Sequence, residues 1–140
     1  MSSHFRQDIQ VSGRSSQNRS AADQFPGVSL FKALGDPNRL KAVLALRHQE
    51  LCACQIVALL DLAPSTVSRH LQILRQSGVI DSQKRGRWIY YRLTDDSIDG
   101  LEREMVLTLI DRVAKSSAAK NLAKNLKKIL SVDPETLCTG

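Results

Sequence analysis

The feature that most constrains the fold of this chain is a pair of short amphipathic segments separated by only three residues. Apolar side chains recur at helical spacing in residues 53–60 and again in residues 64–76. They are Ile56, Leu59 and Leu60 in the first segment, and Val67, Leu71 and Leu74 in the second. Because the turn at residues 61–63 is so short, the spacing predicts a helix-turn-helix.

The flanking sequence predicts further helices and one hairpin. Asp36-Pro37 is a typical helix start, since Asp caps free N–H groups and Pro at the first position loses no hydrogen bond. Gly78 suits the left-handed position that follows a helix. The expected helices are 28–34, 37–47, 53–60, 64–76, 95–115 and 118–130, and the expected strands are 79–84 and 88–93. This order predicts a mainly α winged helix-turn-helix with a small β-hairpin.

Composition divides the 140 residues into three parts. Residues 1–25 are polar and basic and are expected to form a flexible arm. Residues 26–115 are expected to form the winged helix-turn-helix and dimerisation domain, followed at 116–140 by a C-terminal amphipathic helix and tail. Since no apolar run reaches about 18 residues, no membrane span is predicted, and we expect the protein in the cytoplasm.

The net charge of +6 favours a polyanionic partner, either a nucleic acid or an anionic membrane. An RNA-binding module is compatible with this charge, but the predicted strands lack the aromatic pattern of such modules. The sequence has no Gly-rich phosphate loop after a strand, no H-E-x-x-H and no evident Ser-His-Asp order. We therefore expect a binding protein rather than an enzyme.

The outward face of residues 64–76 points to double-stranded DNA as the partner. This face carries hydrogen-bonding residues and no Asp or Glu, whereas a solvated face normally mixes both signs of charge. Arg can read guanine, Gln can read adenine, and Ser can contact either. The hairpin tip adds three cations suited to phosphates. The candidate DNA-binding residues are Ser65, Thr66, Ser68, Arg69, Gln72, Lys84, Arg85 and Arg87.

Four stretches in this order resemble the ArsR/SmtB family of metal-responsive repressors. They are KALGDPNRLKAVLAL, ELCACQI, STVSRHLQILRQSGVI and KRGRWIYYRL, all between residues 31 and 93. The resemblance implies a winged-helix dimer that represses an operator when unliganded and releases it when a thiophilic or transition metal binds. The residues after about 115 lie beyond the resemblance, so their role is not inherited.

The long helix predicted at residues 95–115 indicates a homodimer. Its apolar positions span about 180° of the helical wheel, whereas docking on its own domain needs a stripe of little more than 100°. We expect the excess to pack against a second copy, with Val28 and Phe31 contributing. The apolar positions are Ile98, Leu101, Met105, Val106, Leu109, Ile110 and Val113.

The candidate metal ligands are Cys52 and Cys54, which match the start of the family's arsenic-type site. Val57 stands where that site has its third Cys, so the resemblance breaks there. Cys138, an external thiol or water could supply the third ligand. Residues two apart on a helix point about 200° away from each other, so joint chelation requires an open first helical turn. The expected inducer is arsenite or antimonite, or another soft metal ion, because thiolates select soft ions.

Two hypotheses about the function of the cysteines remain open from the sequence alone. One is a metalloid-responsive repressor, and the other is a repressor of the same family that senses thiol oxidation or sulfide, or has no inducer. The family's second site uses acidic and His residues on the long helix, but no His follows His70 here. A zinc or nickel site is therefore not expected on that helix.

Overall fold

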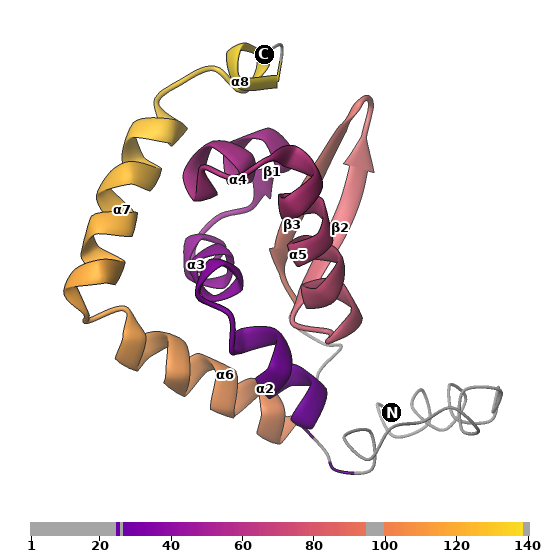
Figure 1. Cartoon of the computed structure of the whole chain (residues 1–140), viewed down its shortest axis with the longest axis vertical. Coiled ribbons are helices and arrows are strands. Elements are labelled where there is room, and N and C mark those ends of the chain that lie inside the picture. Colours follow the sequence, from indigo (N-terminus) through magenta and orange to yellow (C-terminus); the bar gives the residue numbers. More distant parts are fainter. Residues whose placement is uncertain (1–24, 26, 95–99, 139–140) are drawn as a thin grey trace, which may run out of the picture.

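A computed structural model describes residue 25, residues 27–94 and residues 100–138. The elements are α2 (Val28–Leu34), α3 (Pro37–Ala45), β1 (Leu51–Cys52), α4 (Ala53–Leu60), α5 (Pro64–Gln76), β2 (Ile80–Arg85), β3 (Trp88–Leu93), α6 (Gly100–Val113), α7 (Ser117–Leu130) and α8 (Pro134–Cys138). The predicted mainly α winged helix-turn-helix is confirmed (Figure 1). The predicted arm falls almost entirely outside the described residues.

Capping residues determine where the helices begin. At α3, the Asp36 carboxylate accepts hydrogen bonds from the N–H groups of Asn38, at 2.8 Å, and Arg39, at 3.2 Å. Burial opposes ionisation of Asp36, but these N–H groups outweigh it and the pKa of the carboxyl is lowered. At α5, Ala63 supplies no side-chain cap, and Pro64 occupies the first turn instead.

The sheet contains one strand more than the predicted hairpin. Strands β2 and β3 pair antiparallel from Ile80 opposite Leu93 to Arg85 opposite Trp88, and Gly86 between them has a φ of +63°. The additional strand is β1, in which Cys52 lies opposite Tyr90. The strand order is β1-β3-β2, so β3 links the cysteine-bearing segment to the outer strand of the wing.

One aliphatic core holds the helix-turn-helix in place. Its most buried side chains include Leu30, Leu51, Ile56, Leu71, Leu74 and Ile110. Helix α6 runs below α2, and α7 follows the side of the molecule past α3 and α4 (Figure 1). Leu122 anchors α7, leaving its lysines outside as the amphipathic pattern predicted.

Several predicted boundaries need correction. Strand β2 spans Ile80–Arg85 rather than 79–84, and α7 begins at Ser117 rather than at 118. Helix α3 ends at Ala45 rather than near residue 47. Helix α6 ends at Val113 rather than at 115, because Ser116 caps α7 by accepting a hydrogen bond from the N–H of Ala119. The predicted tail at residues 132–140 contains α8, which packs against α4.

Candidate DNA interface and cysteine site

Helix α5 presents the predicted polar face to solvent. Val67, Leu71 and Leu74 are buried on the opposite side, which fixes the orientation of the helix about its axis. The candidate residues on this helix are all exposed: Ser65, Thr66, Ser68, Arg69 and Gln72. The structure therefore brings one guanidinium, one amide and three hydroxyl groups to a single convex surface without a carboxylate.

Arg39 of α3 positions α5, a role that the sequence analysis missed. Its Nε donates to the carbonyl oxygen of Ala33 at 2.6 Å, and its Nη2 donates to that of Lys32 at 3.3 Å. Its Nη1 lies 3.2 Å from Nδ1 of the half-buried His70 on α5. Since one side chain joins α2, α3 and α5, it helps to hold α5 in place. The sequence around Arg39, within the stretch DPNRL, does not indicate this contact.

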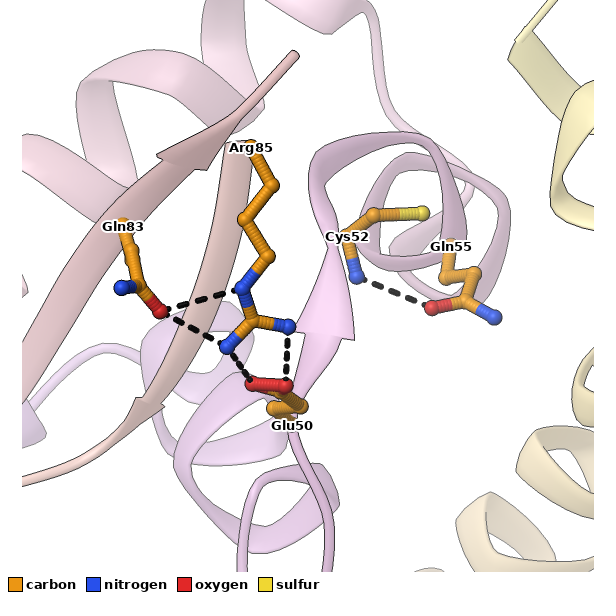
Figure 2. Close-up of polar contacts among 5 residues, drawn as sticks. All are labelled: Glu50, Cys52, Gln55, Gln83 and Arg85. Atoms are coloured by element: carbon orange, nitrogen blue, oxygen red, sulfur yellow. Dashed lines mark hydrogen bonds and ion pairs between the residues drawn. The ribbon is translucent and has the colours of Figure 1, made fainter. Parts of the chain in front are cut away.

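Arg85 at the wing tip is engaged by neighbouring side chains (Figure 2). Its Nη1 and Nη2 donate to the two carboxylate oxygens of Glu50, at 2.6 and 2.8 Å, and its Nε donates to Oε1 of Gln83 at 3.0 Å. The guanidinium also lies 4.6 Å from the ring centroid of Tyr90. The hydrogen bonds from Arg85 lower the pKa of Glu50, because they stabilise the ionised carboxylate.

Arg87, the other wing arginine, is paired with the C-terminal segment. Its Nη2 lies 3.1 Å from a carboxylate oxygen of Glu135 in α8, and its guanidinium carbon lies 5.7 Å from the ring of Trp88. Lys84 is exposed and forms no ion pair with any residue that the structure describes. Of the three predicted wing cations, two therefore have an internal acidic partner.

Cys52 and Cys54 occupy different environments. Cys52 is 1% exposed and has an extended backbone at the start of α4. Its N–H donates to Oε1 of Gln55 at 2.9 Å (Figure 2). Cys54 lies within the first turn of α4 and forms a disulfide with Cys138, the last residue of α8.

In this form Cys54 and Cys138 are bonded to each other, so of the candidate metal ligands only Cys52 is a free thiol. Cys54 and Cys138 are 84 positions apart in the sequence, so no local spacing could reveal their contact. Cys138 thus contacts a cysteine of its own chain. In this form, the described residues hold no cluster of three or more His, Cys, Asp or Glu side chains that could bind a metal ion.

A pocket of about 330 Å³ nevertheless has all three cysteines in its lining. Arg87, Trp88 and Ile89 of the wing form part of its wall, and Ala53 completes it. Val57, at the position of the missing third Cys, is not among the lining residues. The pocket therefore joins the cysteine segment, the C-terminal helix and the wing.

A second hollow, of about 440 Å³, lies between α2 and α6 and is mostly apolar. Phe31 and Met105 at this hollow are 51% and 38% exposed, whereas Val106 and Ile110 are buried in the chain's own core. Helix α6 thus has one apolar side turned inward and further apolar residues turned outward, as its wide stripe predicted. Ile98 and the side chain of Leu101 lie outside the described residues.

No helix in the described part of the chain has the length and apolar character needed to cross a membrane.

Comparison with known proteins identifies the family. Residues 36–82 match the profile described as "Bacterial regulatory protein, arsR family". The chain is 41% identical over 75 residues to a transcriptional repressor SmtB homologue of Synechocystis, covering 54% of this chain and 57% of that protein. It thus spans little more than half of that relative. It is 34% identical over 110 residues to the arsenical resistance operon repressor of Escherichia coli K12, covering 71% of this chain and 93% of that protein.

A solved structure shows the same fold. The homodimeric winged helix-turn-helix DNA-binding domain of a Mycobacterium bovis protein superimposes with a TM-score of 0.50 at 21% identity. The superposition covers 64% of this chain and 82% of that one. Taken with the match to nearly the whole Escherichia coli repressor, the helix-turn-helix and its wing show that this chain belongs to the ArsR family of bacterial transcriptional regulators.

Proposed function

We propose that this protein is a homodimeric repressor that binds operator DNA through α5 and the wing and releases it when a thiophilic metalloid binds to its cysteines. The observation that carries the proposal is the exposed face of α5. It is polar, free of carboxylates and directly opposite the buried stripe that anchors the helix. Such a face can enter the major groove without repelling phosphates.

Within this proposal, the α5 residues have different roles. Arg69 lies mid-helix on the exposed face and is the candidate for a bidentate contact to guanine, and Gln72 is the candidate for adenine. Ser65, Thr66 and Ser68 lie near the start of α5, where hydroxyl groups reach phosphates or base edges. Lys84 at the wing supplies a phosphate contact.

The homodimer is proposed from the apolar hollow between α2 and α6. The occupant that suits it is the same surface of a second copy, because exposed Phe31 and Met105 there would otherwise face water. Two-fold symmetry would place two copies of α5 about 34–36 Å apart, one turn of DNA. The homodimeric Mycobacterium bovis domain supports this arrangement.

Substitution of Arg69 tests the DNA-reading role, with Arg75 as a matched control on the same helix. Arg69→Ala should reduce operator affinity by about 1–3 kcal/mol and blur the preference for operator over scrambled duplex. Arg75 is also exposed but lies about 120° around α5 from Arg69, so Arg75→Ala should retain the preference. Equal binding curves for Arg69→Ala and the unchanged protein would contradict the proposed interface.

The three cysteines lining one pocket support a metalloid inducer. In the reduced protein, Cys54 and Cys138 are close enough to chelate one ion, with Cys52 on the same pocket as a third thiol. Arsenite suits these donors, because each thiol that binds arsenic loses its proton and each displaced hydroxide leaves as water. Of the three sources considered for the third ligand, this pocket favours Cys138 beside the predicted pair Cys52 and Cys54, while Val57 contributes nothing. The name of the Escherichia coli relative supports arsenite as the first ion to test.

Titration of the reduced protein with arsenite, antimonite, cadmium and zinc, read by operator release, tests the inducer. Typical allosteric coupling would weaken DNA binding 5- to 150-fold. The double variant Cys52→Ser, Cys54→Ser should bind DNA normally and not respond, and Cys138→Ser should lower ion affinity. Release of DNA by arsenite from the double variant would eliminate these cysteines as the sensor.

A further inference from the structure

Helix α8 is joined to the DNA-binding part of the chain by two separate links. Cys138 at its end is bonded to Cys54 of α4, and Glu135 in its first turn is paired with Arg87 of the wing. In Figure 1, α8 and the tip of the β2–β3 hairpin lie at the same end of the molecule. The two links therefore hold the C-terminal segment against α4 and against the wing, which both line the cysteine pocket.

The C-terminal segment held by these two links is acidic, whereas the tip of the wing is basic. Asp133 and Glu135 lie within three positions of each other, and α8 contains no Lys or Arg. Asp133 accepts a hydrogen bond from the N–H of Glu135 at 3.0 Å, which fixes the start of the helix. Docking of α8 therefore brings negative charge to the tip of the wing.

Arg87 cannot pair fully with Glu135 and with a DNA phosphate at the same time. A DNA phosphate that approaches this guanidinium meets the carboxylate of Glu135 already 3.1 Å away. The two anions repel each other, and the contact with phosphate is lost or weakened. Both Arg87 and Glu135 are mostly exposed, so the ion pair by itself is weak. The disulfide adds the stability that this ion pair lacks, since it keeps α8 next to the wing.

We propose that α8 competes with DNA for Arg87 and that the Cys54–Cys138 disulfide holds it in the competing position. The disulfide-bonded protein then binds DNA more weakly, and reduction lets α8 leave the wing. This inference rests on the proposed function, in which the wing contacts DNA. It adds a redox control that works without any metal, through a segment beyond the match to the family profile.

The redox step is a thiol–disulfide exchange with a low-molecular-weight disulfide as the oxidant. The thiolate of one cysteine attacks the oxidant and releases one small thiol, and the second cysteine then attacks the mixed disulfide and releases another. The two protein thiols lose two electrons and two protons, which appear on the two small thiols. An excess of a small dithiol reverses the exchange.

The salt dependence of DNA binding tests the competition. Oxidised and reduced protein would be titrated with operator and scrambled duplexes at several salt concentrations. Loss of one phosphate contact should make the plot of log affinity against log salt shallower by about 0.9 in the oxidised protein. The ratio of reduced to oxidised affinity should consequently fall about 3.5-fold between 50 and 200 mM salt, for both duplexes alike.

Three variants separate charge competition from other effects of the disulfide. Glu135→Gln should give the oxidised protein the slope of the reduced one while leaving the disulfide intact. Asp111→Asn removes one acidic charge from an ion pair with Arg47, away from the wing, and should not restore the slope. Cys138→Ser should behave as reduced protein under all conditions, and Cys52→Ser should still switch.

Equal slopes for oxidised, reduced and Glu135→Gln protein would overturn the competition. A difference between oxidised and reduced protein that persists in Glu135→Gln would also overturn it, since the disulfide would then act by another route. Failure of every form to bind any duplex would instead refute the proposed DNA-binding function itself.

Discussion

The carboxylate of Glu50 forms a bidentate ion pair with the guanidinium of Arg85 across the width of the sheet. Glu50 immediately precedes β1 and Arg85 ends β2, while β3 lies between these strands. The pair therefore links the segment leading to Cys52 directly to the tip of the wing. It also means that the charge of Arg85 is compensated inside the molecule before any phosphate approaches.

Removing the charge of Glu50 should strengthen DNA binding. In Glu50→Gln, Arg85 becomes available to phosphate, so operator and scrambled duplexes should bind more tightly by the same factor, with a salt slope steeper by up to about 0.9. Arg85→Ala should weaken both duplexes alike. Fluorescence anisotropy at several salt concentrations measures both effects. Unequal changes on the two duplexes would show that this pair influences base reading.

The cap of α3 should make a measurable contribution to stability. Asp36→Ala removes the acceptor for two N–H groups and should lower the free energy of unfolding by about 0.5–2 kcal/mol. Asp111→Ala, at an exposed position, should change it by less than about 0.5 kcal/mol. Urea denaturation of the two variants provides the comparison, and equal losses would contradict the capping role.

The same cap predicts a pH dependence. The pKa of Asp36 is lower in the folded protein than its ordinary value of 3.8, because the N–H hydrogen bonds outweigh the effect of burial. Its ionised form therefore stabilises the fold fully above pH 3.8, and this contribution is lost as the pH falls through the folded pKa. The stability advantage of the native protein over Asp36→Asn should shrink over that acidic range. An advantage that grows on acidification would have the wrong sign.

The hollow between α2 and α6 should control assembly. Phe31→Glu places a charge on the proposed two-fold interface and should shift micromolar protein from dimer to monomer in sedimentation. Leu130→Glu makes a similar change at an exposed apolar residue of α7 and should leave the dimer intact. A monomeric native protein, or monomers from both variants, would refute the proposed interface.

The disulfide should stabilise the fold as well as hold α8. It closes a loop between residues 84 positions apart, so its removal in Cys138→Ser should cost about 2–4 kcal/mol. A small dithiol should lower the urea midpoint of the native protein and have no such effect on Cys138→Ser. Glu135→Gln, which loses only an exposed ion pair, should stay within about 0.5 kcal/mol. Identical midpoints with and without dithiol would contradict this prediction.

The central helices were predictable because their signals are local. Pro64 marks the start of α5, and the spacing of Val67, Leu71 and Leu74 sets both its orientation and its extent. The predicted bounds of α4 and α5 agree with the structure, as do those of β3. The exposed position of every candidate residue on α5 follows from the same stripe.

The contacts that the sequence did not reveal are between distant residues. Strand β1 has only two residues and exists because Cys52 and Leu51 pair with a strand almost 40 positions away. The partners of Arg85 and Arg87 and the bond from Cys54 to Cys138 likewise depend on tertiary packing. The sequence could identify the cysteines as candidates, but the joining of the C-terminal segment to α4 and the wing needed three-dimensional information.

The disulfide also closes most of the helix-turn-helix and the wing into a covalent ring. Helix α5, both long strands of the wing, α6 and α7 all lie between Cys54 and Cys138 along the chain. A single proteolytic cut anywhere inside this ring leaves the two pieces covalently joined, whereas a cut before residue 54 leaves its fragment without a covalent link to the rest. The oxidised protein can thus be nicked within its central region and still remain one molecule.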